Sequence, residues 1–254
     1  MGTSSPHWWH QVSRDWMLAR RDHLTGSEVA SLRAALTKAT EKSKRAGLVP
    51  AFVKLWGKKH SSAEPNLLST GAAARGHILE PYAIEAYMEE ATIGQAFHWD
   101  DCLIHNGLIA FSPDGLDVPQ PPDVVSIDIK EFEPPTVLFE IKSYEEDHHY
   151  ECLFSEDKMS ALFKSERQQM AVGMYVCPSI EVACLILFNP DVYEGHRMKV
   201  IKYSREDLEN ELKGVEEVLE MWKKTDEIMR ATNFGWEVNV TSDQIWEEAY
   251  GSNC

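Results

Sequence analysis

The spacing of apolar residues changes along the chain from a helical period to strand-like runs. Residues 27–47 have apolar positions at helical spacing, with Ser27 as a candidate N-cap and Gly47 as a stop, which predicts a helix. Residues 71–91 have the same spacing around Pro81, so we expect a second helix that is kinked or broken there. A polar loop joins these two predicted helices.

The middle of the chain is predicted to form strands. Its apolar and alternating segments are separated by Gly, Pro and Asp residues that favour turns. The proline-rich residues 116–135 are expected to form an extended hairpin at the rim of a sheet. The predicted strands are AFHWDDCLIHN, GLIAFSPDG, VVSIDIKEF and TVLFEIKSY.

Helices and strands alternate in the last third of the chain. Residues 163–176 are predicted to be helical, and the continuous apolar run 181–190 is typical of a central strand. Residues 196–203 predict a further strand, and residues 204–230 a long helix with Ser204 as its N-cap. This order predicts an α/β protein in which helices cover a mixed sheet.

The charge of the chain is unevenly distributed. The net charge is −16, but residues 1–60 carry eleven Lys and Arg against only four Asp and Glu. A basic segment on an acidic protein favours an anionic partner such as nucleic acid, although a solvated basic helix face would look the same. On the predicted helix, the basic face carries Arg33, Lys38, Lys42 and Arg45.

Composition and known motifs exclude several classes of protein. No apolar run of membrane-spanning length and no secretory signal are present, so we expect no membrane association. Five cysteines without a CxxC pair fit an intracellular location: the cytoplasm or nucleoid of a prokaryotic host, or a eukaryotic nucleus. GxGxxG, Walker A, GxSxG and HExxH motifs are all absent.

The segment VLFEIKSY, residues 137–144, holds an acid and a base where a buried strand is predicted. Glu140 and Lys142 share one face of that strand, and burying such a pair is costly. If the strand that ends at Asp114 is its neighbour, Asp114 lies level with Glu140. Two carboxylates and the Ile141 carbonyl would then form a site for Mg²⁺, or Mn²⁺ in its place.

A bound cation would give Lys142 a chemical role. A lysine beside metal-bound water helps to deprotonate it and offsets the negative charge that develops on a phosphate. Two ions in such a site would activate water and stabilise the leaving oxygen of an in-line displacement.

The combination SPDG…EIK resembles the signature of PD-(D/E)XK nucleases. Over residues 24–190 the chain is similar to the lambda-exonuclease (YqaJ-like) viral recombinases, whose motifs occur in the same order. The resemblance implies a restriction-endonuclease-like core with a central mixed β-sheet flanked by helices, in one domain spanning residues 1–254. The motifs that carry it are LTGSEVASL, GHILEPYAIEAY, FSPDG, FEIKSY and ERQQMAVGMYV.

The same resemblance implies roles for individual residues. Asp114 and Glu140 correspond to the metal-binding acids, Lys142 to the catalytic lysine, and Glu80 to a helix glutamate that supports the metal site. Gln169, rather than its neighbour Gln168, corresponds to a glutamine near the scissile phosphate or the attacking water. Ser112 corresponds to a serine that contacts the terminal phosphate.

One position departs from the family pattern. The segment that resembles LTGSE ends in a phosphate-binding arginine in lambda exonuclease, and here the residue is Glu28. A carboxylate would repel the phosphate, so another cation has to replace it or the end preference differs. Arg33, Arg75 and His148 are the candidates, and His148 lies where the family places a second phosphate-binding arginine.

The function implied by the resemblance is that of a Mg²⁺-dependent DNA exonuclease. It would degrade one strand of linear double-stranded DNA from its 5′ end to 5′-mononucleotides, as a homo-oligomer, a trimer by resemblance, working with a single-strand annealing protein. Two alternatives stay open: an endonuclease or CRISPR-associated-type nuclease on the same fold, and a catalytically silent protein that binds DNA ends. Cys177 and Cys184 do not supply the cysteine cluster of the iron–sulfur branch.

Overall fold

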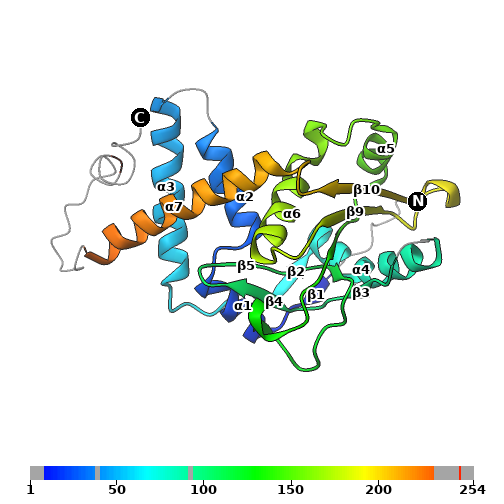
Figure 1. The fold of residues 1–254 in the computed structure, drawn as a ribbon, viewed down its shortest axis with the longest axis horizontal. Coiled ribbons are helices and arrows are strands. Elements are labelled where there is room, and N and C mark those ends of the chain that lie inside the picture. The colour runs from blue at the N-terminus through cyan, green and yellow to red at the C-terminus, as the bar shows by residue number, and fades with distance from the viewer. Residues whose placement is uncertain (1–8, 38–40, 91–93, 232–245, 247–254) are drawn as a thin grey trace, which may run out of the picture.

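A five-stranded mixed sheet forms the centre of the molecule (Figure 1). The computed structural model describes residues 9–37, 41–90, 94–231 and 246, without the side chains of residues 9–11, 41–46 and 48. Strands β8 and β9 run parallel, and the other neighbours in this sheet are antiparallel. The strand order is β10 (Met198–Ser204), β9 (Val182–Phe188), β8 (Val137–Lys142), β6 (Gly115–Leu116) and β3 (Phe97–His98).

Two smaller sheets complete the strand structure. One pairs β1 (Trp9–Gln11) with β2 (Leu68–Thr70). The other has the order β5 (Ile109–Phe111), β4 (Leu103–Asn106) and β7 (Ser126–Asp128). Residues 116–135 connect the antiparallel strands β6 and β8, as a hairpin does, but β7 within this segment pairs in parallel with β4 instead of with a strand of the same segment. The partner of β7 lies about twenty residues upstream, a pairing that local turn signals do not reveal.

Helices cover both faces of the central sheet (Figure 1). Side chains of β8 alternate between two apolar clusters: Leu138 packs in the cluster that includes α6, and Phe139 and Ile141 pack in the cluster that includes α4. Glu140 and Lys142 therefore share the face of Leu138, towards α6. The helices are α1 (Arg14–Ala19), α2 (Gly26–Leu36), α3 (Glu41–Lys59), α4 (Gly71–Glu90), α5 (Glu146–Phe154), α6 (Lys164–Val176) and α7 (Glu209–Ala231).

The predicted helix over residues 27–47 is in fact two helices. Helix α2 has Thr25 rather than Ser27 as its N-cap, and the Glu28 carboxylate accepts a 3.0 Å hydrogen bond from the Thr25 N–H. Helix α3 continues through Gly47, where a stop was expected. Buried residues such as Phe52 attach α3 to the core, and this packing outweighs the low helix propensity of glycine.

Two other helix boundaries differ from the sequence expectation. Helix α4 continues through Pro81 without a break, since Leu79 and Ile84 on either side are buried against the sheet. Helix α7 begins at Glu209, and Ser204 instead ends β10, where its N–H and hydroxyl both donate to Asp207. Within the described residues, no helix combines the length and apolar content that crossing a bilayer requires.

We expect Gly173→Ala to destabilise the fold by about 1–3 kcal/mol, because the added methyl would overpack the contact between α6 and β8. A Cβ at this position would lie 2.7 Å from Leu138 Cδ2 and 3.1 Å from Phe111 Cδ2. Urea unfolding would measure the loss. The control is Gly57→Ala in α3, where a Cβ meets nothing within 4 Å, and unchanged or higher stability is expected. Equal stability of the two variants would contradict the close approach of α6 to β8.

Candidate active site

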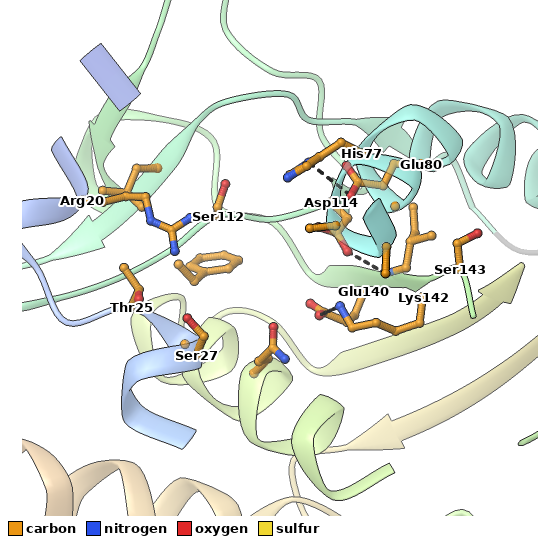
Figure 2. A pocket seen from close by; sticks show the side chains of 18 of the residues that line it. Arg20, Thr25, Ser27, His77, Glu80, Ser112, Asp114, Glu140, Lys142 and Ser143 are labelled. Atoms are coloured by element: carbon orange, nitrogen blue, oxygen red, sulfur yellow. Dashed lines mark hydrogen bonds and ion pairs between the residues drawn. The ribbon is translucent and has the colours of Figure 1, made fainter. Parts of the chain in front are cut away.

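A cavity of about 370 Å³ lies at the end of β8, between the N-terminus of α2 and helix α4 (Figure 2). One wall carries the acidic residues of α4, β8 and the β5–β6 turn together with Lys142. The opposite wall carries Arg20, Thr25, Ser27 and Ser112, and Figure 2 shows these two groups on opposite sides.

Strand pairing brings Asp114 level with Glu140. Gly115 pairs with Phe139 in the antiparallel register of β6 and β8. Asp114, directly before Gly115, therefore lies opposite Glu140, directly after Phe139. Asp114 Oδ2 accepts a 2.7 Å hydrogen bond from the Ile141 N–H. A side chain on Gly115 would contact Ile84 Cδ1 at 2.9 Å, so this glycine permits the close approach of α4.

Lys142 is bound to the nearer acid of the pair. Its Nζ lies 2.6 Å from Glu140 Oε1, and both side chains are largely buried. Burial, followed by the charges of Glu140 and Glu80, raises the pKa of Asp114 well above its ordinary value. Burial also raises the pKa of Glu140, against the influence of Lys142. Burial alone would lower the pKa of Lys142, but Glu140 and Asp114 raise it above its ordinary value.

Glu80 reaches the same cavity from α4. Its two carboxylate oxygens lie 3.5 Å from His77 Nδ1 and 3.6 Å from His98 Nε2. Burial alone would raise the pKa of Glu80, but hydrogen bonding and charge from the two histidines lower it to about 2. Glu80 is therefore an ionised carboxylate held between two imidazoles.

The acidic wall has the donor chemistry that a divalent cation requires. Asp114, Glu140 and Glu80 offer hard oxygen ligands, and the mutual repulsion of buried carboxylates is the imbalance that a cation relieves. Within the residues that the structure describes, no three His, Cys, Asp or Glu side chains are already gathered into a metal-binding cluster. Instead the Lys142 ammonium supplies the positive charge at Glu140.

The opposite wall is rich in hydrogen-bond donors. The Arg20 guanidinium lies over the Trp16 ring, 4.4 Å from its centroid, and no acid among the described residues forms an ion pair with it. Burial lowers the pKa of Arg20. Thr25 is buried and forms the capping box of α2 with Glu28, and Ser27 follows in the first turn of the helix.

Two residues expected from the sequence lie on this side of the cavity. Ser112 lines it and donates to the Cys102 carbonyl at 2.7 Å. Gln169 also lines it, in preference to Gln168, whose amide oxygen, in its corrected orientation, accepts from Arg33. Arg20 was not foreseen, although it is one of the basic residues of the N-terminal part and shortly precedes the α2 cap.

The three cations considered as phosphate ligands lie away from the cavity. Arg33 donates to the Glu211 carbonyl and packs against Gly214 of α7. Arg75 is buried and donates to the carbonyls of Ser143 and Tyr144 and to two side chains beyond them. His148 on α5 contacts Glu151 and the Tyr144 ring. Arg75 thus holds the backbone directly after Lys142.

Glu28 does not carry an unbalanced charge towards the cavity. It lies 2.7 Å from Lys59 and 3.5 Å from Lys58. Burial alone would raise the pKa of Glu28, but Lys59 lowers it below the ordinary value. The repulsion expected from the sequence is therefore already neutralised. Of the predicted basic helix face, the side chains of Lys38, Lys42 and Arg45 lie outside the described residues.

Comparison with known proteins places the fold among solved exonuclease structures. The chain resembles an alkaline exonuclease, LHK-Exo, from Laribacter hongkongensis, with a TM-score of 0.56 and 19% identity, covering 86% of this chain and 97% of that one. LHK-Exo in complex with dAMP gives a TM-score of 0.55 and 22% identity over the same shares of the two chains.

A further structure extends the comparison. A phage-related exonuclease from Haemophilus somnus 129PT gives a TM-score of 0.53 and 12% identity, covering 83% of this chain and 96% of that one. No family model and no curated protein sequence matches the chain. At these identities the likeness establishes the fold, and the prediction of a central mixed sheet flanked by helices is confirmed.

We expect Asp114→Asn to stabilise the metal-free protein at pH 7.5 by about 1–2 kcal/mol. The folded-state pKa of Asp114 is raised, so ionising it costs folding energy once the pH exceeds the ordinary carboxyl range. The gain should be smaller at pH 5, which lies closer to the ordinary carboxyl range, because ionising a group with a raised folded-state pKa costs less there. Chemical unfolding in EDTA at both pH values measures it.

The matched control is Asp147→Asn on the exposed start of α5, which should change stability little at either pH. Loss of stability in Asp114→Asn at both pH values would mean that Asp114 is not electrostatically strained in the metal-free state.

Proposed function

We propose that this chain is a metal-dependent deoxyribonuclease that removes nucleotides from an end of linear double-stranded DNA. The observation that carries the proposal is that one cavity has a cluster of acids with Lys142 on one wall and a set of phosphate-type donors on the other. The acids and Lys142 have the chemistry that phosphodiester hydrolysis requires, and the donors on the opposite wall could bind a terminal phosphate. The fold shared with solved exonucleases supports this proposal.

On the acidic wall, Asp114, Glu140, the Ile141 carbonyl and Glu80 would hold Mg²⁺, two ions in our proposal, with Mn²⁺ as a substitute. Divalent ions bound there would supply an activated water and stabilise the leaving oxygen. Lys142 would place its ammonium where negative charge develops on the scissile phosphate. Gln169, on the neighbouring helix, would orient the phosphate or the attacking water.

On the opposite wall, a terminal phosphate would find several donors. Among the described residues no acid forms an ion pair with the Arg20 guanidinium, and the Thr25 hydroxyl lines the cavity beside it. The N-terminus of α2 begins directly after Thr25, and its free backbone N–H groups favour an anion. Ser27 and Ser112 add hydroxyls. In this proposal Arg20 is the cation that replaces the arginine expected at position 28.

Binding the two phosphates on opposite walls explains why an exonuclease is favoured over an endonuclease. A strand held by its terminal phosphate presents the next phosphodiester to the acidic wall, whereas an internal segment has no terminal phosphate to offer. From the family resemblance we further propose cleavage from the 5′ end to 5′-mononucleotides, an oligomeric state, and cooperation with a single-strand annealing protein in recombination.

We expect Lys142→Ala to lower the rate of Mg²⁺-dependent digestion of linear duplex DNA by about 10²–10⁴-fold, because the scissile phosphate loses its compensating charge. Release of acid-soluble nucleotides measures the rate. Lys202→Ala on β10, an exposed lysine of the central sheet, is the control and should retain wild-type activity. If the wild type binds DNA ends but does not digest them, the chain is a DNA-end-binding protein and not a nuclease. Cleavage of closed circles would indicate an endonuclease.

We expect Arg20→Ala to abolish discrimination between 5′-phosphate and 5′-hydroxyl ends and to raise the KM for phosphorylated ends about tenfold. Duplexes with a 5′-phosphate, a 5′-hydroxyl or a labelled 3′ end would be digested side by side. Arg14→Ala, at an exposed arginine that pairs with Glu64, is the control. Retained end preference in Arg20→Ala would place the terminal phosphate elsewhere.

A further inference from the structure

A buried carboxylate with an unused oxygen lies behind the acidic wall. Glu166, in the first turn of α6, is only 7% exposed. Its Oε1 accepts a 2.9 Å hydrogen bond from the Tyr144 hydroxyl, while its Oε2 is buried and has no hydrogen-bond partner among the described residues. An unsatisfied buried carboxylate oxygen is costly, so its retention requires a physical reason.

The packing of α6 on β8 places Glu166 beside Lys142. A methyl group on Gly173 would lie 2.7 Å from Leu138, which fixes where the two elements meet. Glu166 lies two helical turns before Gly173 on the same side of α6, about 10 Å away. Lys142 lies four residues after Leu138 on the same face of β8, about 13 Å away.

From the contact between Gly173 and Leu138, Glu166 and Lys142 lie in the same direction. Helix α6 ends at Val176, and Val182 of the following strand pairs with Val137 at the beginning of β8. The N-terminal turn of α6 therefore lies towards the end of β8. The charge of Glu166 acts on both Glu140 and Lys142, and its partner Tyr144 is two residues beyond the lysine.

Glu140 has two competing tasks in the proposed nuclease. Its Oε1 holds the Lys142 ammonium at 2.6 Å, so Oε2 alone remains for a cation while that contact lasts. A cation on the same carboxylate would repel the ammonium at this short range. A second acceptor for the lysine would relieve that repulsion and leave both oxygens of Glu140 to the metal.

We propose that Glu166 is this second acceptor, a positioning residue that receives the Lys142 ammonium when Glu140 becomes a metal ligand. The inference rests on the proposed metal-dependent function. Oε2 would accept the ammonium, while Oε1 keeps its bond to Tyr144 and so fixes the carboxylate. Lys142 would remain charged and at the edge of the cavity, close to the scissile phosphate.

The test is metal binding by the full chain without DNA, measured by calorimetric titration with Mn²⁺. We expect Glu166→Gln to weaken binding about tenfold, the scale of one charge-assisted hydrogen bond, because the lysine is less readily released from Glu140. In a Lys142→Ala background, Glu166→Gln should have no further effect, since no ammonium has to move. Glu146→Gln on α5 is the exposed control and should bind Mn²⁺ as the wild type does.

Tyr144→Phe separates this role from a structural one. It removes the hydroxyl that fixes the Glu166 carboxylate but keeps the negative charge, so Mn²⁺ binding should weaken less than in Glu166→Gln, and only while Lys142 is present. Weakening as large as that of Glu166→Gln, or independent of Lys142, would mean that loss of the Tyr144–Glu166 contact alone disturbs the site and would overturn the proposal. The proposal would be overturned if Glu166→Gln weakened Mn²⁺ binding equally in the wild type and in the Lys142→Ala variant. It would also be overturned if Glu166→Gln bound Mn²⁺ with wild-type affinity. A wild type that binds Mn²⁺ but leaves DNA intact would refute the proposed function while leaving this test interpretable.

Discussion

The hydrogen bond from the Ile141 N–H to Asp114 is the contact on which the site depends. It joins the beginning of β6 to the end of β8 and sets two carboxylates side by side in a buried position. Because the two strands are antiparallel, a shift of one residue would turn Glu140 and Lys142 towards the α4 side and destroy the arrangement. Gly115 permits the close approach of α4, and Arg75 of α4 binds the backbone directly after Lys142.

Burying like charges together is unfavourable, and the surrounding residues show how the fold tolerates it. Glu80 is balanced by two histidines, Glu140 by Lys142, and Glu28 by Lys59. Asp114 has only a backbone hydrogen bond, and its pKa is raised accordingly. Asp114 is therefore the acid whose ionisation the surrounding charges oppose most, and a cation bound there would relieve that cost.

The residues that line the cavity come from distant parts of the chain. Arg20 and Thr25 precede α2, Ser112 follows β5, and Gln169 lies on α6. Helix α6 connects them, because Gly26 at the start of α2 packs against Gln169, while other residues of α6 pack against β8. A small displacement of α6 would alter the phosphate wall and the surroundings of Lys142 together, so the two halves of the proposed reaction share one mechanical support.

The sequence by itself determined the local chemistry of the acidic wall. The pairing of Asp114 with Glu140, and the shared face of Glu140 and Lys142, follow from strand alternation and from two segments close together in the chain. Most of the order of helices and strands could also be predicted from the apolar periods, although α1 and α5 were not expected and one predicted helix is two, α2 and α3. The choice of Gln169 over Gln168 came from family resemblance and agrees with its place in the cavity.

Only the tertiary structure decided where the basic residues act. Arg33, Arg75 and Arg20 look alike in sequence, but carbonyl groups of distant segments occupy the first two, and only Arg20 reaches the cavity. The same limit applies to Glu28, whose charge is cancelled by a lysine from the next helix, and to Glu166, whose open oxygen depends on how α6 packs on β8. Long side chains take their partners from three-dimensional packing, which local sequence patterns do not encode.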